Sequence, residues 1–122
     1  MTRFGALLWL AATLAWAQQG VIRVTVDARD APRKLIHVEL NIPAAPGPVT
    51  LLYPQWIPGE HGPTGHIADV VNLKIRAKDH SVAWKRDATN LYAFHVTEPA
   101  GNTALEVSFD FISPVSAGGF SG

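Results

Sequence analysis

The sequence predicts an all-β fold, an antiparallel β-sandwich of about six or seven strands. Apolar and polar residues alternate with a period of two along most of the chain, which is the pattern of half-buried strands. Turns that contain Pro or Gly separate these short segments, and no stretch beyond residue 17 sustains an apolar face at helical spacing. Because antiparallel sheets commonly bury one face only, each sheet is expected to keep one face in water.

The alternation places the expected strands in order along the chain. They are residues 21–27, 35–42, 48–53, 71–78, 82–84, 92–96 and 105–111. In the first, Ile22, Val24 and Val26 alternate with polar residues, which predicts a strand with one buried face. Residues 82–84 are expected to continue the hairpin that 71–78 begins.

The first seventeen residues have the pattern of a secretory signal peptide. Arg3 precedes an apolar run over 6–14, and small residues at 15 and 17 form a cleavage site before Gln18. A membrane anchor is the alternative, but a spanning helix needs about 18 or more consecutive apolar residues. We therefore expect cleavage after Ala17 and export to the periplasm or the extracellular space, with no membrane attachment afterwards.

The remaining chain has the size and charge of one ordinary domain. We expect a single β-sandwich over 18–113, followed at 114–122 by a linker or the start of another element. Without Arg3, the chain has 9 basic and 10 acidic residues and no block of like charge, which does not favour binding to nucleic acid or anionic membranes. It contains no cysteine, so disulfides do not stabilise it.

The familiar catalytic motifs are missing from the sequence. There is no G-x-S-x-G elbow, no P-loop and no dinucleotide fingerprint. A zinc peptidase needs H-E-x-x-H on one helix, whereas Glu60 and His61 occur in the reverse order and glycines and a proline precede His66. The chain alone is therefore expected to have no complete catalytic site and no cofactor.

The longest predicted loop, residues 53–69, holds the candidate site residues. Loops of this length are often functional. Its side chains His61, His66 and Asp69 suit zinc chemically, although their spacing also fits ordinary solvated loop residues, which is the simpler interpretation.

Trp56 lies between two prolines in this loop. A loop held by prolines can present an indole to a peptide or a glycan. The simpler interpretation is a tryptophan packed beneath the loop, because burial of its large apolar area is favourable.

The loop also carries a family resemblance. The motif Tyr-Pro-Gln-Trp-Ile-Pro-Gly-Glu at 53–60, followed by Asp-Val-Val-Asn-Leu at 69–73, Ala-Trp-Lys-Arg-Asp at 83–87 and Leu-Tyr-Ala-Phe at 91–94, resembles the N-terminal domain of the glycyl aminopeptidase family of zinc metallopeptidases. The resemblance covers about residues 21–113. In that family, a β-rich N-terminal domain precedes a zinc-binding catalytic domain with H-E-x-x-H.

The resemblance implies that this chain is the leading part of such an enzyme, or a shortened gene product, whose partner is the catalytic domain that follows. It also implies a role for the loop residues Trp56, Pro58, Gly59, Glu60 and His61 at the substrate cleft or the domain interface. The Glu60 carboxylate would recognise the free ammonium of a peptide. A free-standing secreted module that binds a peptide or a glycan is the alternative.

Overall fold

The computed structural model describes residues 20–113. The predicted signal peptide (1–17) and the predicted linker (114–122) lie outside the described residues. The predicted fold class is confirmed, because the described part of the chain forms eight strands in two antiparallel sheets. The strands are β1 (Arg23–Asp27), β2 (Leu35–Pro43), β3 (Gly47–Leu52), β4 (Val70–Ala77), β5 (His80–Ser81), β6 (Trp84–Arg86), β7 (Ala93–Glu98) and β8 (Ala104–Ile112).

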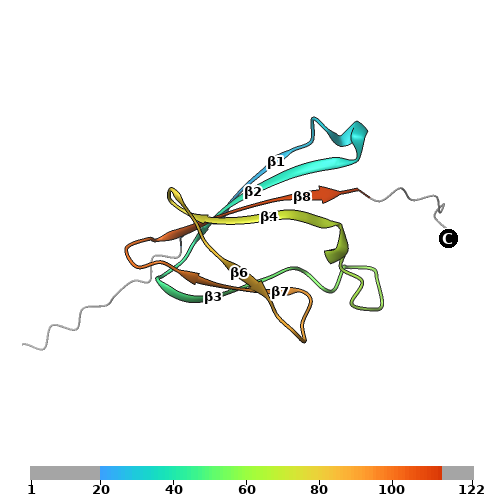
Figure 1. Ribbon diagram of the computed structural model, residues 1–122. Coiled ribbons are helices and arrows are strands. Elements are labelled where there is room, and N and C mark those ends of the chain that lie inside the picture. Colours follow the sequence, from blue (N-terminus) through green and yellow to red (C-terminus); the bar gives the residue numbers. More distant parts are fainter. Residues whose placement is uncertain (1–19, 114–122) are drawn as a thin grey trace, which may run out of the picture.

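The two sheets form the layers of a sandwich (Figure 1). The large sheet has the order β1-β2-β8-β4-β5, and the small sheet has the order β3-β7-β6. Two short 3₁₀ turns, η1 (Ala31–Arg33) and η2 (Ile67–Asp69), lie before β2 and β4. Between residues 20 and 113, no helix is long and apolar enough to span a membrane.

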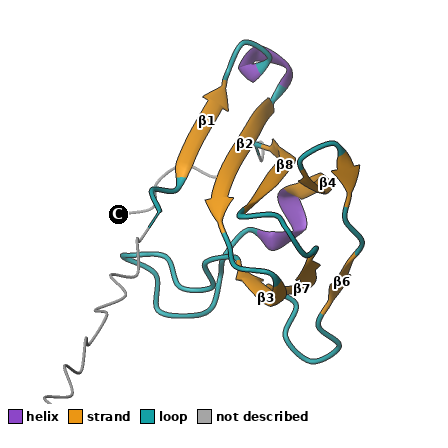
Figure 2. Ribbon diagram, turned by 90° about the vertical axis from the view of Figure 1, so that its left-hand side faces the viewer, coloured by secondary structure: helices purple, strands orange, loops and turns teal. Residues whose placement is uncertain are grey.

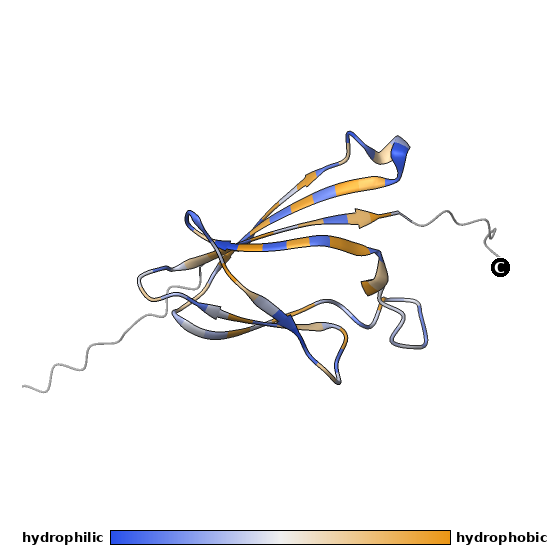
Figure 3. Cartoon of the chain, in the orientation of Figure 1, coloured by the Kyte–Doolittle hydropathy of each residue, from blue (hydrophilic) through white to orange (hydrophobic). Residues whose placement is uncertain are grey.

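The hydrophobic core lies between the small sheet and one end of the large sheet. Apolar and polar residues alternate along β2 and β4 (Figure 3), and apolar residues of β2, β4 and β8 pack in this core. Its buried members are Ile75, Ala77, Val82, Val96, Leu105 and Val107. Of these, Leu105 is 0% exposed and Ile75 is 1% exposed, so β8 and β4 provide the centre of the core.

The prediction for residues 82–84 is only partly correct. The hairpin after β4 is short, consisting of β5 and a hydrogen bond from the Val82 N–H to the Ile75 carbonyl oxygen. The chain then crosses to the other layer, where β6 pairs with β7. Val82 is buried in the core at this crossing, which connects the two sheets.

The prediction of a half-buried first strand is wrong. Val24 and Val26 of β1 are 55% and 59% exposed. The strand lies at the edge of the large sheet farthest from the small sheet, as both Figure 1 and Figure 2 show. The alternation correctly predicts a strand here, but the small sheet does not extend far enough to cover β1.

A β-bulge interrupts the pairing of β4 with β8. The register shifts between Val71 and Lys74, and Asn72 has a φ of 55°. Asparagine tolerates this left-handed conformation better than most residues. The bulge turns the Asn72 amide toward Asp110 of β8, to which it donates a hydrogen bond of 3.0 Å.

Candidate functional site

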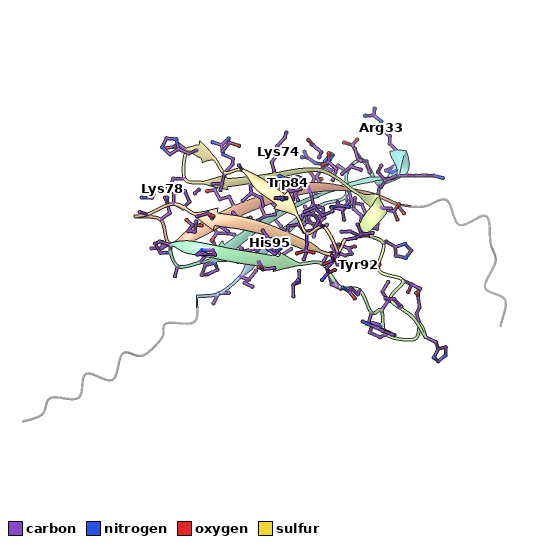
Figure 4. The ribbon with its side chains drawn as sticks, turned by 60° about the horizontal axis from the view of Figure 1, so that its bottom comes forward. Arg33, Lys74, Lys78, Trp84, Tyr92 and His95 are labelled. Carbon is purple, nitrogen blue, oxygen red and sulfur yellow. The ribbon has the colours of Figure 1, made fainter. Side chains whose placement is uncertain are left out.

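The base of the loop at 53–69 is fixed to the small sheet by hydrogen bonds. The Tyr53 N–H donates to the Tyr92 carbonyl oxygen at 2.8 Å, and the Gly65 N–H donates to the Gln55 carbonyl oxygen at 2.8 Å. The Tyr92 hydroxyl lies 3.0 Å from the Pro63 carbonyl oxygen and 3.1 Å from that of Gly65, and donates between them. Tyr92 lies where the loop joins the sheet (Figure 4), and it holds both arms of the loop, the first through its backbone carbonyl oxygen and the second through its hydroxyl.

The inner side of the loop base is partly shielded from water. Burial raises the pKa of the Tyr53 hydroxyl, and the Asp69 carboxylate raises it further. The Gln55 side-chain amide donates to the Asn90 side-chain oxygen at 3.0 Å. A Cβ atom at Gly65 would overlap the Pro54 carbonyl oxygen, so the backbone approaches closely here. These contacts hold the base of the loop against the small sheet, and the tip extends from that base.

The tip of the loop is a tight turn. The Glu60 N–H donates to the Ile57 carbonyl oxygen at 3.0 Å, and Gly59 has a φ of 92°. Pro58 followed by a glycine with positive φ is the signature of a type II turn. The turn leaves Glu60 and His61 exposed at the tip of the loop.

The prediction that Trp56 packs beneath the loop is wrong, because its side chain is 62% exposed. The loop is extended here, so successive side chains point to opposite sides. Tyr53, Gln55 and Ile57 are half-buried, while Pro54 and Trp56 between them are exposed. Since Gln55 occupies the space under the loop, the indole faces outward.

The structure brings only two of the three candidate metal ligands together. His66 Nδ1 lies 3.4 Å from Asp69 Oδ2, whereas His61 is at the exposed tip. Among residues 20–113 there is no group of three His, Cys, Asp or Glu side chains arranged to hold a metal ion. The loop as folded does not fit a zinc site.

On the outer face of the large sheet, His37 contacts two carboxylates, Asp30 and Asp110, in a cluster that is not evident in the sequence. His37 Nδ1 lies 2.7 Å from Asp110 Oδ1, and its Nε2 lies 3.2 Å from Asp30 Oδ2. These hydrogen bonds, that to Asp110 first, raise the pKa of His37, and the same contact lowers the pKa of Asp110. The cluster borders a shallow hollow of about 390 Å³ that Thr25 and Asn72 also line. His37 and Asp110 are a cross-strand pair, which only the strand register reveals.

A second histidine lies on the outer face of the small sheet (Figure 4). His95 Nε2 is 2.8 Å from Asp87 Oδ2, and its Nδ1 is 3.2 Å from the Thr50 hydroxyl. The other Asp87 oxygen accepts the backbone N–H groups of Thr89 and Asn90, so this carboxylate closes the turn before β7. The hydrogen bond to His95, followed by these turn contacts, lowers the pKa of Asp87.

Comparison with known proteins agrees with this architecture. The fold is similar to that of a crystal structure of an aminopeptidase N family protein from Idiomarina loihiensis, with a TM-score of 0.63 and 17% sequence identity. The match covers 75% of this chain and 15% of that protein, so the chain spans a small part of the longer structure. No curated protein matches the sequence. Residues 23–119 match the Peptidase M61 N-terminal domain, which confirms the resemblance to a peptidase N-terminal domain, and the chain belongs to this family.

Proposed function

We propose that this domain is the non-catalytic N-terminal part of an exported metalloaminopeptidase, and that its loop at 53–69 shapes the cleft of a zinc-binding catalytic domain that follows it. The observation that supports the proposal most is that the loop has a fixed base and an exposed tip. Its base is fixed through Tyr92, while Trp56 and the turn at 58–61 extend into solvent. A tip held in one position can contact a neighbouring domain or its substrate without a large ordering cost.

Within this function, we assign Glu60 to the recognition of a substrate's free α-ammonium group. The residue follows the type II turn and is exposed at the tip. A carboxylate that meets an ammonium group in a cleft with little water forms a strong, charge-assisted hydrogen bond. Trp56 supplies apolar contact area on the same loop.

The test is Glu60→Gln in the full-length polypeptide that carries this domain. Loss of a hydrogen bond between charged groups, about 1.5–3 kcal/mol, corresponds to a roughly 10- to 100-fold loss in kcat/KM for peptides with a free N-terminus. Peptides with an acetylated N-terminus should react with variant and parent at equal rates. Glu39→Gln, on an exposed position of β2, is the matched control. Unchanged activity of the Glu60 variant on free peptides would refute the assignment.

Export is tested by mass spectrometry of the protein from the periplasm or the culture medium. Cleavage after Ala17 gives a product that begins at Gln18. Recovery of the protein only from the cytoplasm, with residues 1–17 intact, would contradict this part of the proposal.

The exposure of Trp56 also supports the alternative of a free-standing module that binds a peptide or a glycan. Leu52 and Leu91, next to the Tyr53–Tyr92 pair at the loop base, are 70% and 58% exposed and would extend such a surface. Calorimetric titration of peptides into the 122-residue chain separates the two functions. Binding by this chain alone, lost in Trp56→Ala, would favour the module.

A further inference from the structure

The inner face of the large sheet continues past the core onto β1. In the strand register, Val24 lies opposite Leu40, which lies opposite Val107 of the core. Because directly paired residues share a face, Val24 points to the same side as the core residues. Val26, Val38 and Phe109 form the next such row.

Burial along this face decreases toward the end of β8 and also across the sheet toward its β1 edge. On β8, Leu105 is 0% exposed and Val107 is 6% exposed, whereas Phe109 and Phe111 are only half-buried. On β1, Val24 and Val26 are more than half exposed. We call the uncovered part of this face the open apolar face; it consists of Val24, Val26, Ile36, Val38, Phe109 and Phe111.

We propose that the open apolar face is the docking surface for the polypeptide that follows Ser113 in the full-length protein. Contiguous exposed apolar surface on a sandwich typically marks an interaction site. The inner face of a sheet in a sandwich is normally covered by another layer, and β1 has no extensive contact with any described element except β2.

The direction of β8 supports the polypeptide after Ser113 as the occupant. The buried end of β8 is its start, and the strand runs toward the open end of the face, where it leaves the sheet after Ile112. The Ser113 N–H donates to the Lys34 carbonyl oxygen at 2.8 Å, which holds the departing chain beside the start of β2. The segment that follows therefore emerges next to Phe111 and Ile36, which pair at that point. This inference deepens the proposed function, because it states which surface joins the domain to the next one.

Cysteine labelling tests the proposal, since these 122 residues contain no cysteine. Val26→Cys places a thiol on the open apolar face, and Thr25→Cys, the matched control, places one on the opposite face of the same strand. In the 122-residue chain, both thiols should react with a maleimide at similar rates. In the full-length polypeptide, with any other cysteines removed, Val26→Cys should react at least about tenfold more slowly than Thr25→Cys.

Equal rates for the two thiols in the folded full-length polypeptide would overturn the proposal. Protection of Val26→Cys in the 122-residue chain that increases with protein concentration would also overturn it, because a second copy would then cover the face. Val24→Cys repeats the measurement should Val26→Cys fail to fold. The labelling does not depend on Glu60 or on catalysis. Its result can therefore contradict the docking surface without contradicting the role of Glu60, and the Glu60→Gln result can contradict that role without contradicting the docking surface.

Discussion

Glu98 is a buried carboxyl group without a compensating charge. It follows Val96 on the inward face of β7 and is 2% exposed. Neither carboxyl oxygen has a hydrogen-bond donor among the described residues. Burial therefore raises the pKa of Glu98 above its ordinary value of 4.5. The folded state favours the protonated acid, whereas the unfolded chain ionises at its ordinary pKa.

Glu98→Gln is expected to stabilise the chain at neutral and alkaline pH. A raised pKa contributes stability that is complete below the unfolded value and is lost as pH rises through the folded value. The variant's gain in free energy of unfolding should therefore increase between pH 4 and pH 8, to on the order of 1 kcal/mol. Urea denaturation at both pH values measures it. Glu106→Gln, on an exposed position of β8, is the control. A gain that does not change with pH would contradict the assignment.

The stability that His37 contributes should change with pH in the opposite direction from that of a carboxylate whose pKa is lowered. Its raised pKa contributes stability that is present below about pH 6.5 and is lost as pH rises through the folded value. The lowered pKa of Asp110 contributes stability that is lost in acid. The cluster should therefore stabilise the fold most between about pH 4 and pH 6.5.

Comparison of His37→Gln with the parent chain tests this. The free energy lost in the variant should be larger at pH 5.5 than at pH 9, because only the imidazolium donates to both Asp30 and Asp110. His80→Gln on the exposed β5 should not show the difference. An equal loss at both pH values would mean that His37 acts only through packing.

At the scale of elements, sequence alternation located every one of the larger strands. Alternation could not predict that β6 pairs with β7, because a strand of three residues is too short for its pattern to indicate the neighbouring strand. The prediction that Trp56 is buried, made from its large apolar area, is wrong because the extended loop turns Gln55 inward in its place. The His37–Asp110 contact needed the register of β2 and β8.

Gly65 is a position at which the loop should be sensitive to substitution, because the backbone of the other arm lies close to it. In Gly65→Ala, the new methyl group would overlap the Pro54 carbonyl oxygen and crowd the Tyr92 ring, so the arms of the loop must separate. We expect a stability loss of about 1–3 kcal/mol and faster amide exchange over 53–69. Gly62→Ala, whose Cβ would make only ordinary contact with Thr64, should change stability by less than about 0.5 kcal/mol. Equal effects of the two substitutions would show that the loop base does not fix the tip.

At the scale of the whole molecule, the sandwich is closed at one end and open at the other. The small sheet covers the large sheet where Leu105 and Ile75 lie, and the cover ends before Val26. The sequence could not show this, because the apolar alternation of β1 and of β8 is the same whether or not a layer covers it. How much of the large sheet is covered depends on the size of the small sheet, which has only three strands.

The two ends should therefore respond differently to truncation of an apolar side chain. Leu105→Ala removes a fully buried side chain and should lower the free energy of unfolding of the chain by about 2–5 kcal/mol. Val26→Ala, on the same face of the sheet, should change it by less than about 0.5 kcal/mol, because that side chain already contacts water. Urea denaturation of both variants measures the difference. In the full-length polypeptide the cost of Val26→Ala should rise toward that of a buried valine, because the domain that follows then covers β1. A comparable cost for both variants in the 122-residue chain would mean that the open end is already covered.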